Sequence, residues 1–282
     1  MHIDKIMTSG PVTVEPECPL DDAIRLFEQC GFRHLPVMDD EVLVGMVSDR
    51  DLSLATGWVL TDYRKTEDSK GPEIVREIMR SPVLSLSTLD TPEDAAALIV
   101  GKRIGAVPIM NGKKLAGIVT ETNLLKAFRD EHLSTDLGED NGITVDQMMT
   151  KEVDSLGPDQ FMEDALELCV AKGYRHVPIV ESGRVIGMIS DRDLRFGLGQ
   201  EMVSDMSAQE SGRLEIARTP LSALMAVDVI SVDSRCTLRQ AIDVMLQHHF
   251  GALPVVNGSR LVGILTQTDV LKHVVQRGSV AG

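Results

Sequence analysis

The sequence predicts an α/β protein made of four β-α-β-β-α repeats that associate as two pseudo-twofold pairs. Three regularities predict this fold. Prolines flanked by apolar residues recur 72, 70 and 76 residues apart, at Pro36, Pro108, Pro178 and Pro254. A glycine follows each proline by nine residues, and a serine or threonine follows that glycine by three. An alanine precedes each proline by thirteen residues, so the chain is an internal repeat over its whole length.

The repeats resemble one another in alternation. Residues 31–52 and 173–194 are identical at 11 of 22 positions, and residues 103–124 and 249–270 at 10 of 22. This pattern indicates the duplication of a pair. We place the repeats at 1–55, 74–130, 143–197 and 219–277, with 1–130 as the first pair, 143–282 as the second and 131–142 as the linker. About 50 ordered residues form only a marginal core, so each core should need two repeats.

The elements of the first repeat can be predicted in chain order. A helical turn ends at Met7, and a short strand follows at 12–14. A helix comes next, because Leu20, Ala23, Ile24 and Phe27 have helical spacing. Gly31 should end this helix, as Gly173 should in the third repeat. Similar turns precede the other repeats and end at Met79, Met149 and Met225.

A β-hairpin and a second helix complete the repeat. The hairpin strands are the apolar runs HLPVM and VLVGMV. Asn-Gly separates the equivalent runs at Asn111-Gly112 and Asn257-Gly258, and this dipeptide is a strong hairpin signal. The second helix should begin directly after the serine or threonine that follows the glycine of each repeat.

Composition argues against nucleic acid, anionic membranes and metal ions as partners. The formal net charge is -15, and the chain has only one Trp, two Tyr and six Phe, which disfavours nucleic acid and anionic membranes. The cysteines, Cys18, Cys30, Cys169 and Cys236, form no CxxC pair, so we expect neither a metal site nor a disulfide framework. No signal sequence or run of eighteen apolar residues is present, and we expect a soluble, cytoplasmic protein.

Four polar tetrads stand where the second helix of each repeat begins: SDRD (48–51), TETN (120–123), SDRD (190–193) and TQTD (266–269). Helix capping explains their hydroxyls, but explains aspartate less well, because the capping box prefers the longer Glu or Gln. Alternatively, hydroxyl and carboxylate bind a ribose diol beside a helix N-terminus that favours phosphate.

Basic residues accompany the tetrads in the odd repeats only. Arg33-His34 and Arg175-His176 precede the prolines, and Arg50 and Arg192 lie inside the tetrads. In so acidic a chain, this local positive charge suits an anionic ligand. The even repeats have Gly105-Ala106 and Gly251-Ala252 at the equivalent positions, and these small residues leave room. No phosphate-binding glycine loop, HExxH or GxSxG motif is present, so we expect no enzyme activity.

Together, the spacing, the hairpin and the fourfold tetrad resemble the CBS-domain (cystathionine β-synthase-type) family over essentially the whole chain. The resemblance implies paired repeats, or Bateman modules, that bind AMP, ADP, ATP or S-adenosylmethionine between repeats. It implies ribose contacts at Asp51, Asp193 and Asp269, with hydroxyls from Ser48, Thr120, Ser190 and Thr266. Asn123, in the second tetrad, departs from the pattern. An amide cannot make the charge-assisted contact, so the resemblance does not imply a ribose site there. Phosphate would meet Arg33, His34, Arg175, His176, Arg50 and Arg192, and the base would meet Val37 and Ile179.

We therefore expect a stand-alone regulatory sensor that responds to an adenine nucleotide or S-adenosylmethionine, requires no cofactor or metal, and acts on a protein partner. An interaction module with empty clefts is the alternative, and hydrolysis of the bound nucleotide is a third. The sequence leaves open whether the protein is a monomer or a homodimer.

Overall fold

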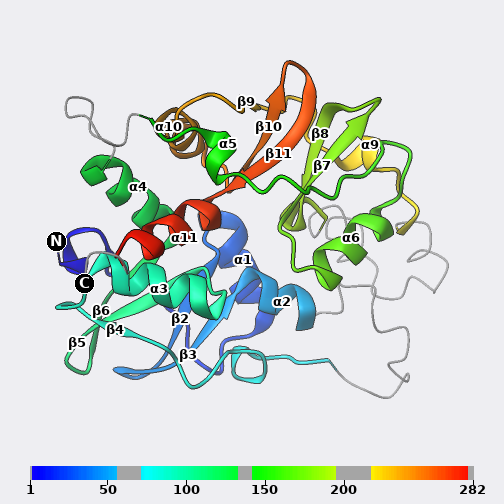
Figure 1. Ribbon diagram of the computed structural model, residues 1–282. Coiled ribbons are helices and arrows are strands. Elements are labelled where there is room, and N and C mark those ends of the chain that lie inside the picture. Colours follow the sequence, from blue (N-terminus) through cyan, green and yellow to red (C-terminus); the bar gives the residue numbers. More distant parts are fainter. Residues whose placement is uncertain (1, 56–70, 133–141, 195–216, 279–282) are drawn as a thin grey trace. The chain divides into compact units, whose positions relative to one another are not determined.

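The computed structural model describes residues 2–55, 71–132, 142–194 and 217–278 (Figure 1). These residues divide into two compact units. The first contains 2–55, 71–132 and 267–278, and the second contains 142–194 and 217–266. The chain thus passes from the second unit to the first between Thr266 and Gln267.

The predicted helix and hairpin are present in all four repeats, which confirms the α/β fold class. The first helices are α1 (Leu20–Cys30), α3 (Pro92–Lys102), α6 (Met162–Ala171) and α10 (Leu238–His248). The hairpins are β2 (His34–Asp39) with β3 (Val42–Ser48), β5 (Ala106–Asn111) with β6 (Lys114–Thr120), β7 (His176–Glu181) with β8 (Arg184–Ser190), and β10 (Ala252–Asn257) with β11 (Arg260–Thr266). The helices that follow are α2 (Asp49–Ala55), α4 (Glu121–His132) and α11 (Gln267–Gly278), and residues 191–194 are also helical.

Turn residues occupy the positions that the sequence predicts. Gly31 and Gly173 have φ of 67° and 72°, and Gly112 and Gly258 in the hairpin turns have φ of 61° and 66°. Glycine adopts this left-handed region without the steric cost that a Cβ atom imposes.

The first strand of each repeat is shorter than predicted. At 12–14 only Val14 is paired, through a parallel bridge to Val37, and Leu156 pairs with Ile179 in the same way. The N–H of Val14 donates to Pro36 O at 3.1 Å, and its carbonyl accepts from Met38 N at 2.9 Å. The even repeats have two-residue strands, β4 (Leu86–Ser87) and β9 (Val232–Asp233). Each segment needs only this brief pairing before it turns into the first helix.

Each turn that ends in methionine, together with the two residues after it, forms a segment that we call a leader. The leaders are exchanged between the repeats of a pair. They contain the short helices η1 (Ile3–Lys5), η2 (Val75–Glu77), α5 (Val145–Met148) and α9 (Leu221–Leu224). Met79 of the second repeat packs on Gly45 of the first, and Met7 of the first packs on Gly117 of the second. In the second unit, Met225 packs on Gly187 and Met149 on Gly263. Each glycine leaves space for the partner repeat's methionine.

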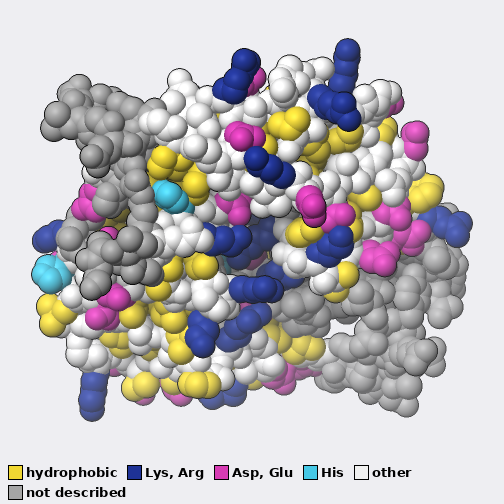
Figure 2. All heavy atoms as spheres, viewed as in Figure 1, with side chains coloured by type: hydrophobic (Ala, Val, Ile, Leu, Met, Phe, Trp, Pro, Cys, Tyr) yellow, Lys and Arg dark blue, Asp and Glu magenta, His cyan; other side chains and the backbone are white. Residues whose placement is uncertain are grey.

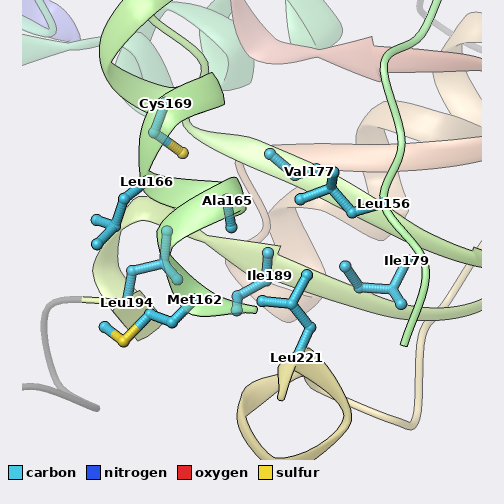
Figure 3. Packing of buried hydrophobic residues seen from close by; sticks show 10 residues of the cluster. All are labelled: Leu156, Met162, Ala165, Leu166, Cys169, Val177, Ile179, Ile189, Leu194 and Leu221. Atoms are coloured by element: carbon cyan, nitrogen blue, oxygen red, sulfur yellow. The ribbon is translucent and has the colours of Figure 1, made fainter. Parts of the chain in front are cut away.

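The exchanged leaders also complete the hydrophobic cores. Leu221 of α9 is fully buried in the core of the third repeat, where it joins Leu156, Met162 and Ile189 (Figure 3). Val75 joins the core of the first repeat, and Ile3 joins that of the second. A single repeat therefore lacks part of its own core, as its small size predicts.

Strand pairing joins the repeats within each unit. β1 (Thr8–Ser9), in the first leader, pairs with β6 in the four-stranded sheet β1-β6-β5-β4, and β2-β3 forms a separate hairpin. In the second unit, the sheet β7-β8-β11-β10-β9 contains strands from both repeats.

The last helix, α11, belongs to the first unit. It lies beside α3 and α4 (Figure 1). Its Leu271 is buried among Ala95, Ile99 and Leu124. Thr268 Oγ1 donates to Glu121 Oε1 at 2.9 Å, so the start of α11 is also bonded to the start of α4.

Candidate ligand-binding site

The hairpin register brings the basic pair of each odd repeat next to its tetrad. His34 is the strand partner of Ser48, and His176 is the strand partner of Ser190. One residue earlier, Arg33 O accepts from Asp49 N at 3.1 Å, and Arg175 O accepts from Asp191 N at 3.0 Å. In the even repeats, alanine takes the histidine position, with Ala106 opposite Thr120 and Ala252 opposite Thr266. Basic residues and tetrad thus share one end of each odd hairpin.

The aspartates at the fourth position of the odd tetrads lie in the first turn of the following helix and cap that helix. Oδ2 of Asp193 accepts from Ser190 N at 2.8 Å and from Ser190 Oγ at 2.7 Å, and Asp193 N donates to Ser190 Oγ at 3.1 Å. Oδ2 of Asp51 makes the same contacts with Ser48. Capping therefore explains these aspartates better than the usual preference for Glu or Gln predicts, because a strand that leads directly into a helix places the hydroxyl within reach of the shorter side chain.

Capping uses Oδ2 and leaves Oδ1, and the two odd tetrads differ at this atom. Oδ1 of Asp51 accepts from Arg80 Nε at 2.9 Å and lies 2.9 Å from its Nη2. Among the residues that the structure describes, Asp193 makes side-chain hydrogen bonds with Ser190 alone and no ion pair. Its Oδ1 can therefore accept a hydrogen bond from a ligand.

In the second tetrad, the side-chain atom that capping leaves over is a hydrogen-bond donor, not an acceptor. Asn123 Oδ1 accepts from Thr120 N at 3.0 Å and from Thr120 Oγ1 at 2.7 Å. This leaves Nδ2, a donor, which lies 3.5 Å from Thr8 Oγ1. An amide can cap the helix, but it offers no charged acceptor to a ribose diol.

In the fourth tetrad, Asp269 is on α11 and its side chain is 9% exposed. Lys272 Nζ donates to its Oδ1 at 3.2 Å, one helical turn away. Thr266, the hydroxyl of this tetrad, is the last residue of β11.

The remaining predicted residues fall into two groups. Arg50 and Arg192 lie in the first turn of the helix after each odd hairpin and are partly exposed. Val37 and Ile179 are 0% exposed and belong to the hydrophobic cores of their repeats. Both residues are fully enclosed, backbone included, so their contact with a base stays a prediction.

Arg80 was not predicted from the sequence. It is the residue after the leader methionine Met79, and its backbone pairs with Met46 of the first repeat. The corresponding residues are Thr8, Thr150 and Ala226. This variation at one repeat position was a visible signal, but its meaning depends on the exchange of leaders, which places Arg80 at its partner's tetrad.

On the face in Figure 2, acidic and basic side chains are both present among polar and apolar ones. The described residues contain no group of three or more His, Cys, Asp or Glu that could hold a metal ion. Burial, with smaller effects from Asp22 and Glu15, raises the pKa of Cys18, and burial with Asp233 raises that of Cys236. Within the described ranges, no helix is long and apolar enough to cross a bilayer.

The fold defines a tandem-repeat protein whose repeats are interlocked in pairs, each hairpin ending in a hydroxyl tetrad. The family model for the CBS domain matches residues 3–56, 75–130, 145–199 and 221–276. The chain therefore belongs to the CBS-domain family.

The chain is similar to other proteins over nearly its whole length. The chain is 27% identical over 273 residues to protein MJ1225 of Methanocaldococcus jannaschii, covering 93% of this chain and 94% of that one. A crystal structure of MJ1225, which is proposed to be an archaeal homologue of g-AMPK, has a TM-score of 0.81 at 26% identity and covers 97% and 99% of the two chains. A conserved protein of Pyrococcus horikoshii has a TM-score of 0.65 at 20% identity, covers 98% and 100%, and is similar in fold.

Proposed function

We propose that the chain is a regulatory sensor that binds adenosine-containing ligands, AMP, ADP, ATP or S-adenosylmethionine, at its tetrads. The observation that carries this proposal is the juxtaposition in the third repeat. There, His176 is the strand partner of Ser190, and Ser190 in turn is hydrogen-bonded to Asp193, whose Oδ1 is available. A ribose diol and a phosphate would find a carboxylate and positive charge at the same hairpin end.

Each group has a distinct role in this proposal. Asp193 accepts the ribose hydroxyls through Oδ1, while its Oδ2 holds the helix cap in place. Phosphate meets the basic residues at the tetrad end of each odd hairpin: Arg33, His34 and Arg50 in the first repeat, and Arg175, His176 and Arg192 in the third. The proposed homology of MJ1225 to g-AMPK supports a nucleotide ligand.

The exchanged leaders provide a route for signalling. Each leader packs on the hairpin of the other repeat in its pair, next to that repeat's tetrad. A ligand that binds a tetrad more tightly in one arrangement of the two repeats therefore shifts the population toward that arrangement. A partner protein that recognises this arrangement would then read the ligand concentration. Binding without chemical conversion is part of the proposal, and product analysis after incubation with nucleotide tests it.

A thermal-shift panel tests the binding. A ligand at a hundredfold its Kd stabilises the folded state by about 2.7 kcal/mol, which shifts the melting temperature by several degrees. We expect at least one of the four ligands to produce this shift. Calorimetric titration should then show weaker binding when Asp193→Ala and Asp269→Ala are combined. An unchanged affinity in that variant would contradict the assigned ribose contacts.

One observation favours a second function, an interaction module with no nucleotide. The acid and hydroxyl of the first and third tetrads complete capping boxes, so their presence is explained without a ligand. Flat melting curves with all four ligands would favour this alternative.

A further inference from the structure

Arg80 places a positive charge on the carboxylate that the proposed function assigns to ribose in the first repeat. Its backbone forms two hydrogen bonds with Met46, from Arg80 N to Met46 O at 2.8 Å and from Met46 N to Arg80 O at 3.1 Å. This bridge holds the leader against β3, close to Ser48, the strand's last residue and the first residue of the tetrad. The guanidinium then reaches Oδ1 of Asp51, with both Nε and Nη2 at 2.9 Å.

The ion pair uses the acceptor that a ribose would need. Oδ2 of Asp51 is already occupied by the cap from Ser48, and the Asp51 side chain is only 10% exposed. The guanidinium carries a full positive charge and brings two nitrogens to Oδ1, whereas a sugar hydroxyl is a neutral donor, so the hydroxyl is the weaker partner for Oδ1. The Arg80 side chain is 65% exposed, which limits the strength of the pair and allows the guanidinium to move away.

The second pair contains a natural comparison. Ala226 occupies the position of Arg80, and it forms the same backbone bridge, with Ala226 N to Met188 O at 2.9 Å and Met188 N to Ala226 O at 3.1 Å. A methyl group cannot contact a carboxylate by hydrogen bonding. Within the described part of the chain, the Asp193 side chain accordingly has hydrogen bonds with Ser190 alone. The two sites differ in the side chain that the partner repeat's leader supplies.

We propose that Arg80 is a specificity-determining residue that occupies the ribose acceptor of Asp51, so that adenosine-type ligands bind the Asp193 site before the Asp51 site. This inference rests on the proposed function. Binding at Asp51 must release the guanidinium, and a ligand phosphate offers it a new anion. The Asp51 site should therefore prefer nucleotides to the uncharged nucleoside more strongly than the Asp193 site does.

Calorimetric titration of the full chain with adenosine tests the proposal, because an uncharged ligand is insensitive to the long-range effect of removing an arginine. We expect Arg80→Ala to tighten binding at the Asp51 site about fivefold, a modest effect for an exposed ion pair. Adding Asp51→Asn to this variant should abolish the gain. Ala226→Arg should weaken the Asp193 site by a similar factor.

Arg76→Ala is the matched control. Arg76 lies in the same leader and is exposed, but its Nε donates to Glu17 at 2.7 Å and makes no contact with Asp51. It should leave adenosine binding unchanged. If adenosine binds the Asp193 site and Arg80→Ala leaves binding at Asp51 the same or weaker, the proposal for Arg80 is wrong while the sensor function stands. If neither adenosine nor any of the four proposed ligands binds the wild-type chain or any variant, the proposed function itself is wrong, and the role of Arg80 falls with it.

Discussion

Individual tetrad residues have two tasks that can be separated. The carboxylate of Asp193 caps a helix through Oδ2 and leaves Oδ1 for a ligand. Asn123 shows that an amide performs the first task, because its Oδ1 accepts from both the N–H and the hydroxyl of Thr120. The amide lacks the charged second oxygen that the proposed ribose contact requires.

Asp193→Asn should therefore lower ligand affinity without loosening the helix. We expect about tenfold weaker binding of AMP at this site, since a charge-assisted hydrogen bond is replaced by a neutral one. The free energy of unfolding should change little, whereas Asp193→Ala should also lose about 1 kcal/mol from the broken cap. Calorimetry and urea denaturation measure the two effects. A large stability loss in Asp193→Asn would show that the charge serves the fold and not the ligand.

The capping residues of α3 extend this reasoning to pH. Thr91 donates its hydroxyl and its backbone N–H to Oδ2 of Asp94, at 2.7 and 2.9 Å. These two bonds, the hydroxyl first, lower the pKa of Asp94 below its usual range. A carboxylate with a lowered pKa stabilises the folded state fully above its unfolded pKa, and this contribution is lost as the pH falls through the folded pKa.

Asp94→Ala should consequently cost about 1 kcal/mol near neutral pH, within the range measured for helix caps. The difference between wild type and variant should shrink as the pH falls below about 4, where aspartate becomes protonated. Urea denaturation of both proteins at a series of pH values measures this difference. A constant difference across the series would mean that the charge of Asp94 contributes nothing to the cap.

At the scale of elements, the leaders depend on glycines in the partner repeat. A Cβ atom on Gly45 would overlap Sδ of Met79, which is the end of a flexible side chain. A Cβ atom on Gly117 would lie 2.6 Å from Sδ of Met7 and also 2.8 Å from the backbone oxygen of Thr8. The first overlap can be relieved by moving a side chain, but the second requires the leader backbone to move.

Gly45→Ala and Gly117→Ala should each lower stability by about 1–3 kcal/mol through overpacking. Adding Met79→Ala should recover part of the Gly45→Ala loss, because the overlapping side chain is removed. Adding Met7→Ala should recover less of the Gly117→Ala loss, because Thr8 O remains in place. Double-mutant cycles in urea give the two coupling energies. Equal coupling in both cycles would contradict the role of the Thr8 backbone.

The sequence predicted these elements better than it predicted their partners. The spacing of Leu20, Ala23 and Phe27 gave α1, and the Asn-Gly turns gave the hairpins, because both signals are local. Met79 and Gly45 were each visible as repeat positions, yet their contact joins two repeats and has no local signature. Arg80 was missed for the same reason. The strand at 12–14 was predicted too long, because apolar β-branched residues are also found where a chain pairs only once.

At the scale of the whole molecule, α11 connects the fourth repeat in sequence to the first unit in packing. It follows β11 directly in sequence, but it packs in the first unit beside α3 and α4. Leu271 is 0% exposed in the core of the second repeat, and Val274 and Val275 pack against the same core. The end of the chain therefore stabilises a repeat that lies more than a hundred residues earlier in sequence.

Leu271→Ala tests this dependence. Removing a buried leucine side chain typically costs about 2–5 kcal/mol, from lost transfer energy and the cavity that remains. The loss should fall on the first unit, so amide hydrogen exchange should accelerate in α3 and α4 while β7 and β8 stay protected. Ile242→Ala, which opens a similar cavity in α10 of the second unit, is the matched control and should give the reverse pattern. If Leu271→Ala leaves exchange in α3 unchanged, α11 does not support the second repeat in solution.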